Sequence, residues 1–137
     1  MSLEKTTNLS QKKATENIAS STIDFQMLKQ FEKSMGPEIV LTLIEQFIDY
    51  VPQQLVALQQ SVAMGNSEAL RSQVHQFKGE SLQIGANQLS NLCQQLEILA
   101  QEGQLETASA NITQIEQEWA KVKIVLTHHF DSSGKPL

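Results

Sequence analysis

The sequence predicts an all-α protein: an up-and-down antiparallel four-helix bundle with a short extra N-terminal helix. First, apolar residues recur every three or four positions from residue 25 to residue 126, as in amphipathic helices packed side by side. Second, 6 glycines and 3 prolines in 137 residues are too few for a β-fold that turns every 8–12 residues or so. Third, the linkers are short, which makes successive helices antiparallel neighbours.

Composition narrows the class of protein. With 10 basic and 15 acidic residues, the net charge is −5, so no basic face for nucleic acid is expected. A single cysteine excludes an intrachain disulfide, a zinc finger and a CxxC pair. No apolar run approaches about 18 residues, and no signal-peptide core is visible. We therefore expect a single-domain cytoplasmic protein that does not bind membranes.

The N-terminal part contains a tail and a short helix. Residues 1–20 are polar without a helical stripe, which predicts a flexible tail. A Ser21-x-x-Asp24 capping pattern opens a stripe over residues 25–35. Gly36 and Pro37 then indicate a stop followed by a new helix. Its longer stripe runs over residues 40–62, and Pro52 within it predicts a kink.

Two further helices follow in the middle of the chain. Gly65 and Asn66 end the long helix and cap the next one, whose stripe covers residues 70–84. Gly85 closes that helix. Asn87 is the expected cap of the following helix, with its stripe over residues 89–99.

The last helix follows a break at Gly103 and has its apolar stripe over residues 105–126. Trp119 and Phe130 are expected to fill the core or plug its end. Residues 131–137 are expected to be a loose C-terminal tail, so the bundle is assigned to residues 21–130.

One face of the helix over residues 70–84 gathers chemically useful groups. At about 100° per residue, Arg71, Lys78, Gly79 and Leu82 all fall within about 60° of His75. The apolar stripe of the same helix lies at about −100° to −160°, so His75 is expected on the outer shoulder of the helix. A histidine with a pKa near ~6.5 is largely neutral at pH 7 and is a good nucleophile toward phosphorus.

The neighbours of His75 suit a phosphorylated imidazole. The Lys78 ammonium could hold phosphoryl oxygens. Gly79 leaves space for a partner to approach the ring, although a glycine inside a helix costs about 1 kcal/mol relative to alanine. No glycine-rich phosphate loop opens any helix, so a nucleotide site is not expected.

The run HQFKGESLQIGA at residues 75–86, followed by Cys93 and Leu96-Glu97, resembles the histidine-containing phosphotransfer (HPt) domain family. The resemblance covers about 110 residues. The family pattern is roughly H-x-[LF]-K-G-[SA]-[SA]-x-x-[LI]-G-A, from which this chain departs at Glu80, where a small residue is usual. Just before the motif, Val74 replaces a common alanine. At about +140° from His75, Glu80 is expected to point to solvent, away from the ring.

The resemblance assigns roles to several residues. It implies that His75 is the phospho-acceptor, that Lys78 interacts with the phosphoryl group and that Glu97 orients the imidazole. Receiver docking is assigned to Arg71, Gly79 and Leu82, and structural roles to Ser81 and Gly85. We expect the Ser81 hydroxyl to bond to the carbonyl four residues earlier, and Cys93 to be a small buried residue rather than a reactive thiol. No function is assigned to His128 or His129.

The implied function is that of a phosphorelay intermediate rather than an enzyme. A monomeric chain would take a phosphoryl group on His75 from a receiver-domain aspartate and pass it to another receiver aspartate. The partners would be receiver domains of hybrid histidine kinases and response regulators. The chain has no ATP-binding domain and is expected to hold no cofactor or metal, because the receiver supplies Mg²⁺.

Two alternatives stand beside this interpretation. A non-phosphorylated helical adaptor could bind receiver domains as a scaffold. A metal-binding bundle would need Glu-x-x-His or His-x-x-x-His pairs facing inward, and the chain has neither.

Overall fold

The computed structural model describes residues 22–132, with side chains as far as His128, and this part of the chain forms five α-helices and no strand. The expected all-helical class is confirmed. The helices are α2 (Phe25–Met35), α3 (Pro37–Ala63), α4 (Ser67–Gln83), α5 (Asn87–Gln101) and α6 (Leu105–Ser132). The expected tail over residues 1–20 and the side chain of Phe130 lie outside this description.

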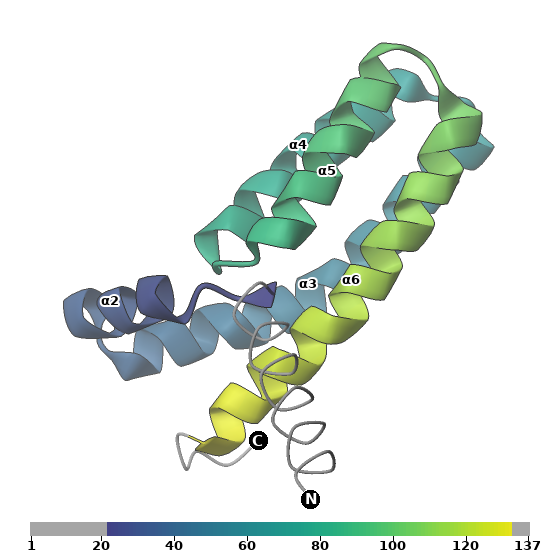
Figure 1. Cartoon of the computed structure of the whole chain (residues 1–137). Helices are drawn as coiled ribbons and strands as arrows, with labels where there is room; N and C mark the ends of the chain where they lie inside the picture. Colours follow the sequence, from purple (N-terminus) through teal and green to yellow (C-terminus); the bar gives the residue numbers. More distant parts are fainter. Residues whose placement is uncertain (1–21, 133–137) are drawn as a thin grey trace, which may run out of the picture.

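Four helices contact one another in a closed ring. α4 packs on α5, α5 on α6, and α3 on both α4 and α6, while α2 packs mainly on α3 (Figure 1). α3 and α6 are the longest helices and extend past the α4–α5 pair, and α2 lies along the projecting part of α3 (Figure 1). The α4–α5 pair is therefore held against only part of the two long helices.

Most residues of the core belong to the apolar stripes that the periodic pattern predicted. Leu70, Val74 and Phe77 of α4 are fully buried, as are Leu89 and Leu96 of α5. Trp119 of α6 is buried and its ring meets Phe47 of α3 edge to face, with ring centroids 5.6 Å apart. Such edge-to-face pairs are favourable beyond the area they bury. This apolar centre fixes which face of α4 remains exposed.

Helix boundaries agree with the sequence in part. Gly36 ends α2 and Pro37 begins α3, and Asn66 caps α4 by accepting a hydrogen bond from the Ala69 amide. The expected cap at Asn87 is wrong, because Ala86 is the N-cap of α5, without a side-chain hydrogen bond. The first helix is capped by Asp24, whose carboxylate accepts from the Met27 amide. Ser21 lies outside the described residues.

The structure can be compared with further expectations about Pro52, the end of α6 and the buried side chains. α3 is continuous through Pro52, and the kink expected at this residue stays a prediction. α6 continues to Ser132, two residues into the segment expected to be a loose end. The buried Ser81 hydroxyl forms no hydrogen bond to the carbonyl four residues earlier, so the expected bond to the preceding turn is absent. Ser81 is nevertheless fully buried, and Cys93 is buried as expected, with the pKa of its thiol raised by burial to about 12.

Gly85 joins the start of the described chain to the α4–α5 turn. Its φ is +82°, and its carbonyl accepts a hydrogen bond of 2.8 Å from the Asp24 amide. A Cβ at this position would lie 3.2 Å from the Asp24 carbonyl oxygen. Any side chain would therefore meet both an unfavourable backbone conformation and a close backbone contact.

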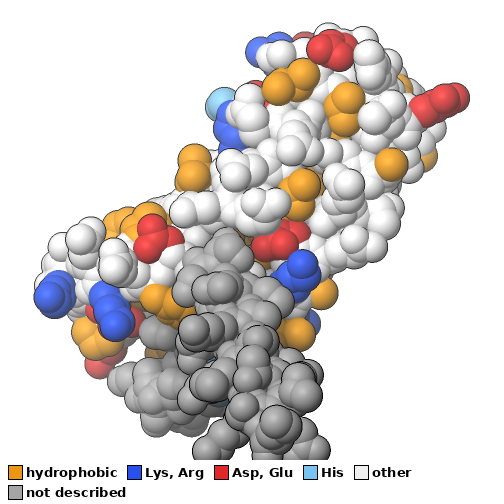
Figure 2. Space-filling model, in the orientation of Figure 1, with side chains coloured by type: hydrophobic (Ala, Val, Ile, Leu, Met, Phe, Trp, Pro, Cys, Tyr) orange, Lys and Arg blue, Asp and Glu red, His pale blue; other side chains and the backbone are white. Residues whose placement is uncertain are grey.

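Within residues 22–132, no helix combines the length and the apolar character that crossing a membrane requires. In the same range, no three His, Cys, Asp or Glu side chains come together as a group able to hold a metal ion. On the face shown in Figure 2, hydrophobic side chains are scattered among polar ones in small groups. No single large apolar surface dominates that view.

Candidate functional site

His75 stands on the exposed side of α4 and is tied to α5 by one hydrogen bond. Its side chain is 68% exposed, and its Nδ1 lies 2.8 Å from Oε2 of Glu97. An ionised carboxylate only accepts hydrogen bonds, so Nδ1–H donates and the proton is held on Nδ1. The second ring nitrogen, Nε2, then keeps its lone pair free toward solvent.

Glu97 is a buried residue of α5 that contacts two side chains of the site. It is only 8% exposed, and it lies one turn after the fully buried Cys93. Its second oxygen, Oε1, accepts a hydrogen bond of 2.7 Å from Nζ of Lys78. One carboxylate therefore bridges the imidazole and the ammonium, which satisfies a charge that would otherwise be costly to bury.

Lys78 is held more firmly than an exposed helix lysine. Its side chain is only 21% exposed, and its ammonium also donates to Oε1 of Gln94 at 2.8 Å. His75 and Lys78 are three residues apart on α4, and their partners Glu97 and Gln94 are three apart on α5 in the reverse direction. This register shows that α4 and α5 run antiparallel at the site.

The electrostatics of this cluster favour an ionised Glu97. The hydrogen bond from Lys78 is the largest influence, and together with the bond from His75 it lowers the carboxyl pKa below its usual value of 4.5, against the opposing effect of burial. An ionised acceptor at this position favours the Nδ1–H tautomer of the neutral imidazole.

The lowered pKa of Glu97 predicts that this residue stabilises the folded protein only while its carboxyl is ionised. Because the folded-state pKa lies below the unfolded one, the stabilising effect is present above about pH 4.5 and is lost as the pH falls through the folded pKa. The difference in free energy of unfolding between wild type and Glu97→Gln should therefore shrink on acidification. Urea titrations from about pH 6 to about pH 3 measure it, with the exposed Glu106→Gln as control. A difference that stays constant, or grows, in acid would contradict the assignment.

The remaining residues predicted for the site surround His75. Arg71 is exposed one turn before it, and both line a surface hollow of about 380 Å³ together with Glu68, Ser72 and Glu97. Leu82 is 50% exposed, and Gly79 is exposed with no atom within 4 Å of a Cβ built on it. Ser81 and Gly85 are buried on the core side and do not reach the site.

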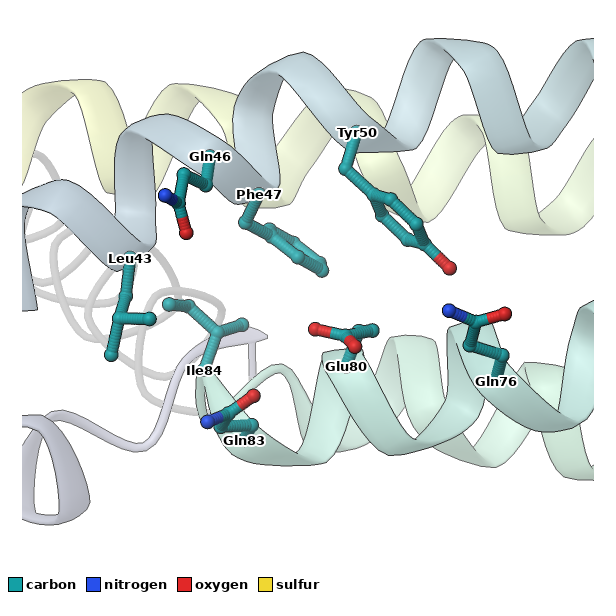
Figure 3. A pocket seen from close by; sticks show the side chains of 8 residues that line it. All are labelled: Leu43, Gln46, Phe47, Tyr50, Gln76, Glu80, Gln83 and Ile84. Atoms are coloured by element: carbon teal, nitrogen blue, oxygen red, sulfur yellow. The ribbon is translucent and has the colours of Figure 1, made fainter.

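Two features of the site were not predicted. Gln94 was overlooked, although its position one turn before Glu97 on the same helix places both on one face. Glu80 was expected to point to solvent, and this is wrong: it is half-buried and faces α3 in a groove with Tyr50 and Phe47 (Figure 3). It does lie away from the His75 ring, and its proximity contributes, after burial, to raising the pKa of Tyr50 to about 12.

Comparison with known proteins yields one family and one solved structure. The sequence matches the Hpt domain family over residues 42–124, which includes His75, Lys78 and Glu97. The fold is similar to the crystal structure of histidine-containing phosphotransfer protein B (HptB) from Pseudomonas aeruginosa PAO1, with a TM-score of 0.76. That match has 32% sequence identity and covers 81% of this chain and 96% of the other. Comparison with curated protein sequences gave no significant match.

The family match spans more than half of the chain and includes the exposed, hydrogen-bonded histidine on α4, so the protein belongs to the Hpt domain family.

Proposed function

We propose that this protein is a phosphorelay carrier that takes a phosphoryl group on Nε2 of His75 from the aspartate of one receiver domain and passes it to the aspartate of another. Membership of the Hpt domain family supports a role in histidine phosphotransfer in two-component signalling. The observation that supports His75 as the acceptor is its 68% exposed ring, with Nδ1 bound to a buried carboxylate and Nε2 free.

The transfer step follows from this geometry. The Nε2 lone pair attacks the phosphorus of the aspartyl phosphate, an N–P bond forms, and the P–O bond breaks to release the aspartate carboxylate. Positive charge then develops on the ring, and the Glu97 carboxylate, 2.8 Å from Nδ1, stabilises it. Transfer to the second receiver is the reverse of this step, with another carboxylate as nucleophile.

Lys78 can assist the phosphoryl transfer because its existing hydrogen bonds do not use all of its donors. An ammonium group has three donors, and two of them are used by Glu97 and Gln94. The third donor remains for an oxygen of the phosphoryl group one helical turn away. In this arrangement Lys78 partly neutralises the incoming charge while it keeps Glu97 ionised.

The chain acts as a carrier rather than as a classical enzyme. In this proposal the receiver domain brings the acidic residues and the Mg²⁺, and the present chain brings the nucleophile and a docking surface around Arg71, Gly79 and Leu82. Both receivers need the same histidine, so each complex is transient. We also propose that the carrier is a cytoplasmic monomer. An up-and-down bundle of α3 to α6, with α2 as the extra helix, is the topology that we propose for residues 21–130.

The direct test of function is incubation of the purified chain with phosphorylated receiver domains encoded by the same genome. We expect transfer of the phosphoryl group from at least one receiver, in a form that is labile in acid and stable in alkali. Binding of receivers without any labelling of the chain would instead identify it as a non-phosphorylated adaptor.

Lys78→Ala should slow this transfer and lower the yield or lifetime of the phosphohistidine. Because Lys78 belongs to a partly buried ion pair with Glu97, a stability loss of about 1 kcal/mol is also expected. Transfer kinetics and urea unfolding measure the two effects separately. The exposed Lys123→Ala on α6 is the matched control. Wild-type kinetics in Lys78→Ala would show that the ammonium is incidental to transfer.

A further inference from the structure

A groove between α3 and α4 lies beside the proposed docking surface and has no assigned role. It encloses about 320 Å³ and is lined by Leu43, Gln46, Phe47 and Tyr50 from α3, by Gln76, Glu80 and Gln83 from α4, and by Ile84, which directly follows α4 (Figure 3). Leu43, Phe47 and Ile84 lie toward one end together with Gln46 and Gln83, and Tyr50, Glu80 and Gln76 lie toward the other (Figure 3). The groove therefore offers both apolar and polar contacts.

Glu80 is an acceptor without a partner in this groove. Its carboxylate faces α3 between Gln76 and Ile84 (Figure 3), and among residues 22–132 no cation or donor forms an ion pair or hydrogen bond with it. The Tyr50 hydroxyl at the same place is buried and has no hydrogen-bond partner either. A half-buried carboxylate and a buried hydroxyl that both lack partners are unfavourable in the free protein.

A cation with an alkyl stem would provide a partner for the Glu80 carboxylate and contacts for the apolar side chains of this groove. A guanidinium carries five donors in a planar fork, which suits the Glu80 carboxylate, the oxygen of Gln76 and the face of the Tyr50 ring. The aliphatic stem of an arginine would pack on Leu43, Phe47 and Ile84. The chain's net charge of −5 favours approach of such a group.

The groove is continuous with the surface around His75. Going round α4 from His75, the exposed Gly79, Gln83 and Gln76 lie at about +40°, +80° and +100°, and Glu80 follows at about +140°. Glu80 is five residues from His75, which is about 7.5 Å along the helix axis. A typical interface buries about 800 Å² on each partner, a patch roughly 30 Å across. A receiver centred on His75 therefore reaches the groove.

We propose that the α3–α4 groove is a specificity pocket that receives an arginine side chain of the docked receiver domain, with Glu80 as its counter-ion. This inference rests on the proposed phosphocarrier function, because the arginine is supplied by the receiver. It makes Glu80 a residue that selects partners without touching the reacting atoms.

The first experiment tests the pocket without any receiver. The full chain is titrated with n-butylguanidinium and with the uncharged n-butylurea while the side-chain amides of Gln46 and Gln76 are followed by NMR. We expect saturable shifts with butylguanidinium only, lost in Glu80→Gln and retained in Glu116→Gln, which removes the same charge from α6. Equal responses to both compounds, or a response unchanged in Glu80→Gln, would overturn the pocket.

The second experiment uses a receiver that phosphorylates the wild-type chain. Glu80→Gln should raise the KM of phosphotransfer about tenfold with little change in kcat, because truncating one partner of a desolvated charge pair weakens binding. Glu116→Gln should leave both constants unchanged. An unaltered KM in Glu80→Gln overturns the arginine pocket while phosphotransfer itself stands. If no receiver phosphorylates the wild-type chain, the carrier function fails, and the receiver arginine with it.

Discussion

Replacing His75 by glutamine should reduce phosphoryl transfer from a receiver domain to background and leave the helical fold intact. The ring is 68% exposed and contributes no core packing, so its removal opens no cavity. The glutamine amide can still donate to Glu97, and Lys78 still neutralises that carboxylate. Circular dichroism checks the fold, and transfer from a labelled receiver checks the function.

The matched control for this experiment is His128→Gln. His128 is exposed near the end of α6, well away from the α4–α5 pair in sequence, and has no part in the proposed site. It should transfer at the wild-type rate. Residual transfer to His75→Gln, or loss of transfer in His128→Gln, would show that the acceptor has been wrongly assigned.

Gly79→Gln should transfer poorly although it folds normally. A Cβ at Gly79 meets no atom within 4 Å, so a side chain is accommodated in the free protein. It would instead stand about 40° from His75, in the path of a receiver domain that docks over the ring as we propose. Forcing extra atoms into a packed interface costs about 1–3 kcal/mol, which corresponds to roughly 5- to 150-fold in rate.

Gly79→Ala separates stability from function at the same position. An alanine inside a helix is favoured over glycine by about 1 kcal/mol, which would raise the Tm by about 3–5 °C in a domain of this size. We expect this variant to be at least as stable as wild type and slower in transfer. Thermal unfolding and transfer rates are measured on the same samples. A Gly79→Gln protein that folds and transfers at the wild-type rate would remove the steric argument.

The fold was predictable because its main determinant is periodic. The stripe of Leu70, Val74 and Phe77 fixes the buried side of α4, and the same spacing places His75 on the exposed side. Helix ends were less predictable, since caps depend on local geometry. Asn66 and Asn87 both stand within two residues after a glycine, but of the two only Asn66 caps a helix with its side chain.

The site was predictable along one helix and less so between helices. The offsets of Lys78 and Gly79 from His75 follow from helical geometry alone. The bond from Lys78 to Gln94 depends on the register of α4 against α5, which a single sequence does not specify. Glu80 shows the same limit: its angle on α4 was correct, but only the position of α3 determines that this angle faces a groove.

The central claim is that His75 alone receives the phosphoryl group, on Nε2. The most direct measurement is site mapping, under alkaline conditions, of the full chain after incubation with a phosphorylated receiver. We expect one phosphorylated residue, His75, with the N–P bond at Nε2 because Nδ1 is bound to Glu97. Phosphate on His128 or His129 with His75 unmodified, or attachment at Nδ1, would contradict it.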